Sequence, residues 1–304
     1  MIMPSSLLSS YYDSIATLSE NTIKQRKNCL DRWRRFLLSR NKDLLDARQY
    51  DFSAFARENM DRGISDSTIK TYLLRIKYFY QFAFEEEVFP GKEYKRIALF
   101  ANTLRVEKGK IITNLSPEHL EILREEIAHN RTLQMATFML LNFGLRLNEL
   151  IQLNLSDFNF DEKELLVRRS KYKRSRIIPF NRQIQQVIFH WLDTRENYLP
   201  VSSKEDAFLI LKYTNSPPTR FWLQHEYWKI SKKYQDIGLH VTAHRLRHHF
   251  ACRLFYELNY EIYDVSWVLG HASIKTTMHY LGIDEQMRKE SYLQKMPDDV
   301  LVRI

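Results

Sequence analysis

The interpretation of this sequence rests on one stretch near the C-terminus, Ala243-His244-Arg245-Leu246-Arg247-His248-His249-Phe250, and on two short segments that follow it, Leu269-Gly270-His271-Ala272-Ser273 and Thr276-Thr277-Met278-His279-Tyr280-Leu281. Residues three positions apart share one face of a helix, so His244 and Arg247 are neighbours if their segment is helical. Ser273 is placed to cap a second helix whose second turn carries Tyr280. The pattern therefore predicts imidazoles, a guanidinium and a phenol on adjacent elements.

These residue types suit chemistry at a phosphodiester. An arginine can bind two phosphate oxygens at once, and a histidine can move a proton near neutral pH. A tyrosine oxygen can act as a nucleophile once its proton is removed and its charge is offset. The same residues could instead be an ordinary polar helix end beside a tyrosine that is half-buried in the core. These residues alone do not distinguish the two interpretations, so evidence from the rest of the sequence is needed.

Size and charge narrow the class of protein. The 304 residues suffice for two domains of ordinary size, and 44% hydrophobic residues suffice for packed cores. There are 46 basic and 37 acidic side chains, which gives a net charge of +9 and a pI of about 9.3. Such an excess favours a polyanionic partner, nucleic acid first, although a solvated basic surface would have the same composition.

Other sequence features point to the interior of a cell and away from several kinds of site. The two cysteines, Cys29 and Cys252, form neither a disulfide framework nor a metal-ligand pair. No apolar run approaches a membrane span, and the N-terminus does not have the pattern of a signal peptide. No glycine-rich phosphate loop is present. We therefore expect a cytoplasmic protein with no membrane partner.

The N-terminal part, residues 1–105, is expected to be entirely helical. Residues 18–24 resemble residues 64–70, each copy opens with a serine cap, and both continue with apolar residues at helical spacing. The pattern predicts two long amphipathic helices that pack together in a helical bundle. Their polar faces are basic and form either a DNA-facing surface or a solvated one; we expect the first, with Lys24, Arg26 and Lys27 on one helix and Lys70, Arg75 and Lys77 on the other.

A basic linker is expected at residues 106–114. Pro90-Gly91 reads as the end of the second long helix pattern, and the segment from Leu99 to Ile112 has no clear periodicity. This segment contains Arg105, Lys108 and Lys110, which could lie along a phosphate backbone.

The C-terminal part, residues 115–304, is expected to be mixed. A helix capped at Ser116-Pro117 is followed by an apolar core helix from Thr132 to Phe143 that ends at Gly144. Three short strands are expected at 157–160, 164–169 and 176–180, and helices at 181–198, 219–235, around His244, at 261–269 and at 284–295. The fold class is therefore mainly α with a small antiparallel β-sheet, in two domains.

Two further groups in this part are candidates for the site. Arg146 and Glu149 are three positions apart, so the carboxylate can hold the arginine in place. The turn between the second and third strands is rich in charge and includes Lys171, Lys173 and Arg174. A lysine there could reach into a site or could simply be solvated.

The chain resembles the tyrosine recombinase (phage integrase) family, and within it the compact Xer-like members. The resemblance spans roughly residues 10–290 and is carried, in order, by Gly144-Leu145-Arg146-Leu147-Asn148-Glu149-Leu150, Ser170-Lys171-Tyr172-Lys173-Arg174-Ser175-Arg176-Ile177-Ile178-Pro179, His244-Arg245-Leu246-Arg247-His248, Leu269-Gly270-His271 and Thr276-Thr277-Met278-His279-Tyr280. It implies a helical core-binding domain followed by a catalytic domain with a C-terminal docking helix.

The resemblance implies roles for the nucleophile and for the groups that move protons. Tyr280 would attack the scissile phosphorus and form a 3′-phosphotyrosine. His244 would help to take the Tyr280 proton, and Lys171 would protonate the departing 5′ oxygen. Lys173 is a rival for the lysine role, because Ser170 and Tyr172 stand where the family often has glycine.

The resemblance also implies a phosphate clamp. Arg146 and Arg247 would bind the non-bridging oxygens, and His271 would also bond the phosphate. Glu149 would brace Arg146, and Asp157 would have a lesser structural part. His248 and His249 could suggest zinc beside His244, but carboxylates or thiolates in a ligand-like spacing are missing, so we expect neither a metal nor another cofactor.

The expected function is site-specific recombination of double-stranded DNA by a homotetramer on two DNA sites. The target sequence, the need for a second recombinase or an accessory factor, and the choice between chromosome-dimer resolution and integration or excision of a mobile element stay open. The alternatives are a type IB topoisomerase-like relaxing enzyme and a non-catalytic DNA-binding accessory protein on the same fold.

Overall fold

The computed structural model describes residues 4–105, 114–168, 175–200 and 205–283. The chain divides into two compact units, Met1–Lys110 and Ile111–Ile304. The predicted fold class, mainly helical with a small antiparallel sheet and two domains, is confirmed. Among the described helices, none combines the length and the apolar character that crossing a membrane requires.

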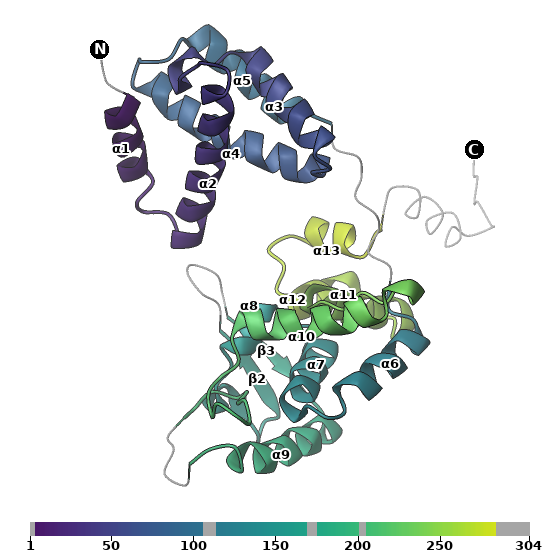
Figure 1. Ribbon diagram of the computed structural model, residues 1–304. Coiled ribbons are helices and arrows are strands. Elements are labelled where there is room, and N and C mark those ends of the chain that lie inside the picture. Colours follow the sequence, from purple (N-terminus) through teal and green to yellow (C-terminus); the bar gives the residue numbers. More distant parts are fainter. Residues whose placement is uncertain (1–3, 106–113, 169–174, 201–204, 284–304) are drawn as a thin grey trace, which may run out of the picture. The chain divides into compact units, whose positions relative to one another are not determined.

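The described part of the N-terminal unit is helical throughout, as predicted (Figure 1). Its helices are α1 (Pro4–Ser14), α2 (Glu20–Leu38), α3 (Gln49–Asp61), α4 (Asp66–Glu85) and α5 (Gly91–Thr103), with a 3-10 turn at Leu44–Asp46. The two helices of the internal similarity, α2 and α4, pack against each other as expected.

A buried hydrogen-bond chain fixes the packing of α2 against α4. The Nε1 of Trp33 donates to the hydroxyl of Tyr80 at 2.8 Å, and that hydroxyl donates to the backbone carbonyl of Leu44 at 2.8 Å. Both side chains are fully buried among aromatic rings. Because an unpaired buried polar group costs about 1–3 kcal/mol, the two hydroxyl bonds specify one arrangement of these helices.

Two expectations about this region were wrong: Pro90-Gly91 does not end the second long helix, and the start of the segment from Leu99 to Ile112, expected to lack a regular pattern, is helical. The second long helix, α4, has already ended at Glu85, and Pro90 is the N-cap of another helix, α5, which continues to Thr103. A Cβ at position 91 would lie 2.7 Å from the ring of Phe84, so a larger residue there would force this exposed ring to move. Only Ile97 and Ala101 of α5 are buried, which explains why the apolar pattern was too sparse to detect.

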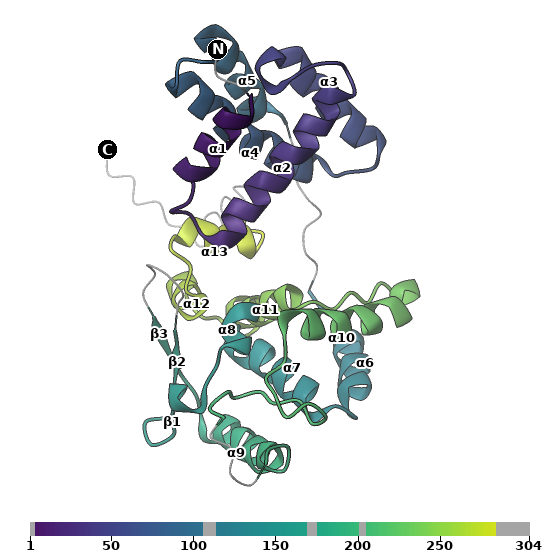
Figure 2. The ribbon, with the colours of Figure 1, turned by 60° about the vertical axis from the view of Figure 1, so that its left-hand side comes forward.

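The C-terminal unit places a three-stranded sheet beside a group of helices (Figure 2). Its helices are α6 (Pro117–Ile127), α7 (Arg131–Phe143), α8 (Leu147–Ile151), α9 (Arg182–Glu196), α10 (Arg220–Lys233), α11 (Ala243–Cys252), α12 (Ile262–Leu269) and α13 (Ile274–Tyr280). The strands are β1 (Phe158–Asn159), β2 (Glu164–Val167) and β3 (Arg176–Pro179), antiparallel in the order β1-β2-β3. The helix predicted at 284–295 lies outside the described residues.

The packing of α7 against α11 positions the candidate site. Gly144 ends α7 in the left-handed conformation, with φ of 57°, as the sequence predicted for a C-terminal glycine. A Cβ at this position would lie 2.3 Å from the ring of Phe250 in α11. Glycine is therefore needed both for the backbone turn and for the close approach of α11.

Candidate active site

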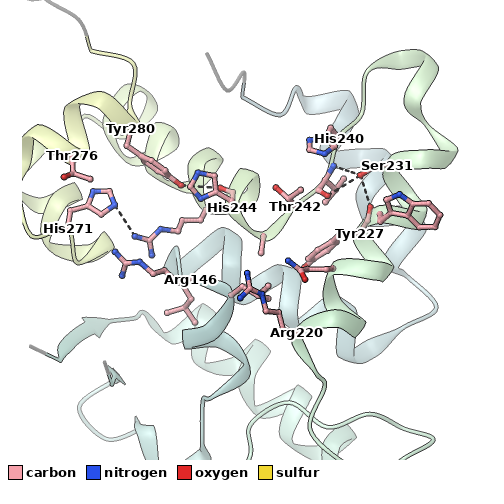
Figure 3. Close-up of a pocket in the computed structure, with 17 residues that line it drawn as sticks. Arg146, Arg220, Tyr227, Ser231, His240, Thr242, His244, His271, Thr276 and Tyr280 are labelled. Atoms are coloured by element: carbon pink, nitrogen blue, oxygen red, sulfur yellow. Dashed lines mark hydrogen bonds between the residues drawn. The ribbon is translucent and has the colours of Figure 1, made fainter. Parts of the chain in front are cut away.

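A cavity of about 660 Å³ in the C-terminal unit contains most of the predicted catalytic residues (Figure 3). Its lining includes Arg146, His244, Arg247, His271 and Tyr280, which come from the start of α8, from α11, from the loop before α13 and from the end of α13. The lining also includes residues of α10, among them Arg220 and Tyr227, which lie on the side of the cavity opposite His271. The sixth predicted residue, Lys171, lies outside the described residues, as do Lys173 and Arg174.

Arg247 is a fixed, buried cation. Its side chain is only 3% exposed, and its Nη1 and Nη2 donate to the backbone carbonyls of Gly144 at 2.6 Å and Leu269 at 2.7 Å. Burial and the nearby charge of Arg146 lower the pKa of Arg247 to about 10. The guanidinium therefore stays charged at neutral pH, and its orientation is set by two other segments of the chain.

Arg146 is more exposed and is held by the carboxylate that the sequence indicated. Its Nη1 and its backbone N donate to the two oxygens of Glu149, each at 2.8 Å, and its Nη2 donates to the carbonyl of Gly270 at 3.2 Å. The side chain is 42% exposed. Part of the guanidinium can therefore face a ligand in the cavity.

Glu149 connects more arginines than the sequence suggested. Besides Arg146, it accepts hydrogen bonds from Arg176 at 3.0 and 2.9 Å, and its Oε2 lies 3.7 Å from Nη1 of Arg247. Burial alone would raise the pKa of Glu149, but the hydrogen bonds and charge of Arg176, followed by the contacts with Arg146, lower it to about 2. The carboxylate is therefore ionised throughout the physiological range.

The role of Arg176 was not predicted from the sequence, where this residue appears only in the segment Ser170 to Pro179 that carries the resemblance. Arg176 opens β3, is 6% exposed, and donates from Nε to the carbonyl of Val268 at 2.6 Å in addition to its bonds with Glu149. Burial alternates along β3 and begins with Arg176 on the buried face. A charged residue at an inward position of a strand requires a buried partner, but the sequence Arg-Ile-Ile-Pro does not show which of its residues face inward.

Tyr280 ends α13, which Ser273 caps by accepting from the backbone N of Lys275. The Tyr280 hydroxyl donates to the backbone carbonyl of His244 at 3.3 Å, and its ring contacts the imidazoles of His244, His248 and His271 with centroid distances of 5.2, 5.1 and 5.4 Å. Burial raises the pKa of Tyr280 to about 12, although Arg247 and Arg146 act to lower it. The phenol is therefore neutral and needs a base to become a nucleophile.

Two histidines of the cavity differ in their partners. Burial and the charge of Arg247 lower the pKa of His244, so its imidazole is neutral at pH 7 and able to accept a proton. The Nδ1 of His271 is 2.9 Å from Oγ1 of Thr277, and its Nε2 is 3.3 Å from Nη2 of Arg247. Thr277 fixes the orientation of this ring and was not among the predicted residues.

Asp157 lies away from the cavity. Its carboxylate accepts from the backbone N of Asn154 at 2.9 Å and forms an ion pair with Arg168 at 2.5 Å. Asn154 precedes the 3-10 turn before β1, and Arg168 follows β2. Its contacts therefore brace the sheet at the base of the β2–β3 turn.

Aromatic rings hold two of the basic residues predicted to face DNA. The guanidinium of Arg26 lies over the ring of Tyr78 at 4.1 Å, and the ammonium of Lys27 lies over the ring of Tyr12 at 4.5 Å. Lys24, on the same helix, is exposed. Cation–π contacts restrict these side chains without neutralising their charge, so the polar face of α2 stays basic.

The basic residues predicted on α4 have polar partners within the unit. Lys70 donates to the carbonyl of Leu104 at 2.7 Å, Arg75 to the side-chain oxygen of Gln25 at 2.5 Å, and Lys77 to that of Asn102 at 3.3 Å. Arg105, which follows α5, is exposed, whereas Lys108 and Lys110 lie outside the described residues. Lys70 and Lys77 thus help to fasten α5 to α4.

No metal site is found in the part of the chain that the structure describes. Within it, no group of three or more histidine, cysteine, aspartate or glutamate side chains is arranged to hold an ion. His248 and His249, which might have joined His244 around zinc, have other partners: Cys252 lies 3.6 Å from Nδ1 of His248, and Asn114 lies 3.1 Å from Nδ1 of His249.

Comparison with known families gives two matches. The model described as "Phage integrase family" matches residues 113–287, and the model described as "Phage integrase, N-terminal SAM-like domain" matches residues 8–87.

Individual proteins and structures are also similar. Tyrosine recombinase XerC of Listeria welshimeri is 25% identical over 296 residues, or 94% of this chain and 95% of that protein. Tyrosine recombinase XerA of Pyrococcus horikoshii is 32% identical over 169 residues, which covers 54% of this chain and 55% of that protein. The Tn1549 transposon integrase in complex with transposon right end DNA is similar in structure, with a TM-score of 0.74 at 19% identity over 97% of this chain and 99% of that one.

Proposed function

The chain belongs to the phage integrase family and is a tyrosine recombinase, and from this premise we propose that it cuts and rejoins double-stranded DNA at specific sites through a covalent bond between Tyr280 and a 3′-phosphate. The observation that carries the proposal is one cavity lined by the phenol of Tyr280 and by the guanidiniums of Arg247 and Arg146. The positive charges of both arginines act to lower the pKa of the phenol. Both cations act on the oxygen that would attack the phosphate.

The first chemical step forms the Tyr280 Oη–phosphorus bond and breaks the bond between phosphorus and the 5′ oxygen. The proton of Tyr280 passes to the neutral imidazole of His244, and Lys171 protonates the departing 5′ oxygen. The energy of the broken phosphodiester is retained in the phosphotyrosine. A 5′-hydroxyl from a second strand can therefore reverse the step and join the DNA, which requires neither ATP nor a metal ion.

Arg247 and Arg146 stabilise the charge that develops on the non-bridging oxygens. Because both guanidiniums are held by backbone carbonyls and by Glu149 before DNA binds, little reorganisation is needed in the transition state. One preorganised donor of this kind is worth about 100- to 1000-fold in rate. His271, oriented by Thr277, adds a further donor to the phosphate.

The partner is double-stranded DNA, and the two parts of the chain have different tasks. Residues 1–105 form a core-binding domain that contacts DNA through the basic side chains of α2 and α4, residues 106–114 form a basic linker, and residues 115–304 form the catalytic domain. The net charge of +9 supports this assignment. So does the Tn1549 integrase, whose structure contains transposon end DNA.

The active assembly is a homotetramer on two DNA sites, and residues 284–295 dock on a neighbouring subunit. Truncation after residue 283 should weaken assembly on DNA, measured by light scattering, more than it weakens binding to one site. Unchanged assembly would contradict the docking role. A cytoplasmic location stays a prediction to be tested in cells.

The test begins with a binding site selected from random-sequence duplex DNA. A nick placed next to the scissile phosphate lets the short 5′-ended fragment diffuse away and traps the covalent adduct, which denaturing electrophoresis detects. Wild type should form the adduct and Tyr280→Phe should not, whereas Tyr234→Phe, which removes a hydroxyl bonded to the remote Glu126, should behave as wild type.

The other outcomes separate the alternatives. An adduct in Tyr280→Phe would refute the assignment of the nucleophile. Relaxation of any supercoiled plasmid by a monomer would favour the topoisomerase-like alternative, and binding without cleavage would favour the accessory protein.

A further inference from the structure

Arg176 is a buried arginine beside the candidate active site that the proposed reaction does not use. It is not among the residues that line the cavity. Its Nη1 and Nη2 donate to the two oxygens of Glu149 at 3.0 and 2.9 Å, and its Nε donates to the backbone carbonyl of Val268 at 2.6 Å. A phosphate in the cavity would therefore feel Arg176 only through its neighbours.

The end of α12 holds Arg176 together with both arginines of the phosphate clamp. Three consecutive backbone carbonyls, those of residues 268–270, accept hydrogen bonds from Arg176, Arg247 and Arg146 in that order, at 2.6, 2.7 and 3.2 Å. Carbonyls at the C-terminal end of a helix lack donors within the helix and carry partial negative charge, so they attract cations. The three guanidiniums are therefore fixed at neighbouring positions.

Glu149 contacts the same three arginines. Besides the two hydrogen bonds from Arg176, it accepts two from Arg146 at 2.8 Å each, and it lies 3.7 Å from Nη1 of Arg247. This carboxylate holds Arg146 in place, but its negative charge also opposes the approach of a phosphate. Three guanidiniums and one carboxylate leave two positive charges, whereas only one would remain without Arg176.

We propose that Arg176 is a positioning residue for the phosphate clamp, and that it neutralises the carboxylate that braces Arg146. An arginine fork fits both oxygens of a carboxylate. Because Arg176 occupies Glu149 in this way, the charges of Arg146 and Arg247 remain available to the phosphate. The inference rests on the proposed function, since it concerns the same clamp.

The test measures single-turnover cleavage of the nicked site at saturating DNA. Arg176→Lys keeps the positive charge but loses the planar fork, whereas Arg176→Gln keeps N–H donors but loses the charge. A third variant combines Arg176→Gln with Glu149→Gln, which restores the two positive charges of wild type. The affinity for DNA and the Tm are measured for each variant.

Arg195 supplies the matched control. It is 4% exposed, compared with 6% for Arg176, and it also donates to backbone carbonyls, those of Glu205 and Ala207. It is not among the residues that line the cavity. Arg195→Gln and Arg195→Lys should therefore cleave at close to the wild-type rate below their Tm, even if the Tm falls as much as in the Arg176 variants.

We expect Arg176→Gln to slow adduct formation about 10- to 100-fold, less than the loss of a clamp arginine, because Arg176 acts on the phosphate from a distance. Arg176→Lys should stay within about threefold of wild type, and the double variant should be at least about threefold faster than Arg176→Gln. The affinity for DNA should change by less than about threefold in each, since many other phosphates contribute to binding. A purely structural role of the fork predicts equal rates in the Lys and Gln variants.

Equal rates in Arg176→Lys and Arg176→Gln would overturn the inference, and so would a double variant no faster than Arg176→Gln. A loss of rate in Arg195→Gln as large as that in Arg176→Gln would overturn it as well, because it would trace the defect to stability.

If Arg176→Gln alone does not fold, the same change is judged in the Glu149→Gln background, where no buried carboxylate is left unpaired. There it should still slow cleavage, and an unchanged rate would overturn the inference. In each of these cases the wild-type adduct would leave the proposed function intact. Absence of an adduct in wild type would instead overturn the proposed function, and the role of Arg176 with it.

Discussion

The hydroxyl of Tyr280 donates a hydrogen bond to the backbone carbonyl of His244 at 3.3 Å, while the imidazole of the same residue meets the edge of the Tyr280 ring. A backbone carbonyl cannot take the phenolic proton, whereas an imidazole can. The phenol that we propose as the nucleophile is therefore paired with an acceptor that leaves it protonated, and the proposed base lies beside it.

The first prediction concerns pH. The pKa of His244 is lowered from 6.5, so its neutral form predominates above that value and is lost as the pH falls through the lowered pKa. The single-turnover cleavage rate should be flat between about pH 7 and pH 8.5 and fall on the acid side of about pH 6.5. His244→Gln should be at least about 100-fold slower and should lose this acid limb. An unchanged acid limb in the variant would rule out His244 as the base.

The second prediction separates the two arginines of the clamp. Arg247→Lys cannot satisfy both the Gly144 and the Leu269 carbonyls, so it should destabilise the protein by about 1–3 kcal/mol and slow cleavage about 100- to 1000-fold. Arg146→Lys should slow cleavage to a similar degree, but its Tm should stay near that of wild type because the side chain is 42% exposed. Equal loss of stability in the two variants would contradict this distinction.

The third prediction concerns Glu149 and acid stability. Its pKa is lowered from 4.5 to about 2 in the folded protein. The ionised carboxylate therefore stabilises the fold above pH 4.5, by up to about 3 kcal/mol, and this contribution is lost as the pH falls from 4.5 to 2. Glu149→Gln should be less stable than wild type at pH 7, and the difference in unfolding free energy should shrink over that window.

Glu121→Gln is the control for Glu149. Glu121 is 53% exposed and pairs with the exposed Arg124, so its replacement should change stability by less than about 1 kcal/mol at either pH. A difference between wild type and Glu149→Gln that stays constant down to pH 2 would refute the role assigned to the charge of Glu149.

The fourth prediction decides between Lys171 and Lys173 as the general acid. A sulfur in place of the 5′ bridging oxygen leaves as a thiolate and needs no proton, because thiols have a pKa of about 8.5. Lys171→Met should slow cleavage of the oxygen substrate by at least about 100-fold and should cleave the sulfur substrate nearly as fast as wild type. Lys173→Met should show neither effect. The reverse pattern would assign the role to Lys173.

Local patterns in the sequence were enough to predict the main elements. The serine cap of α2, the terminal Gly144 of α7 and the pair Arg146 and Glu149 all depend on neighbours within a few residues, whereas Ser65 stands at the start of α4 without a capping hydrogen bond. Their physical causes are therefore visible in a single segment of the chain. The segments that contain the arginines, the histidines and the tyrosine follow one another in an order that resembles a known family. This resemblance predicted that these distant positions form one site.

Long-range contacts could not be predicted in the same way. Glu149 and Arg176 are 27 positions apart and come together only when β3 packs beside α8 and α12. The contact between the rings of His248 and Tyr280 likewise depends on how α13 packs against α11. The helix α5 was missed for a different reason, since only two of its residues, Ile97 and Ala101, are buried.

The central claim is tested most directly by mass spectrometry of the trapped adduct after digestion with trypsin and a nuclease. The account predicts a nucleotide attached through a 3′-phosphate to the hydroxyl of Tyr280, in the peptide that begins at Thr276. A nucleotide attached to any other residue, or a cleaved site with no nucleotide on the protein, would contradict it.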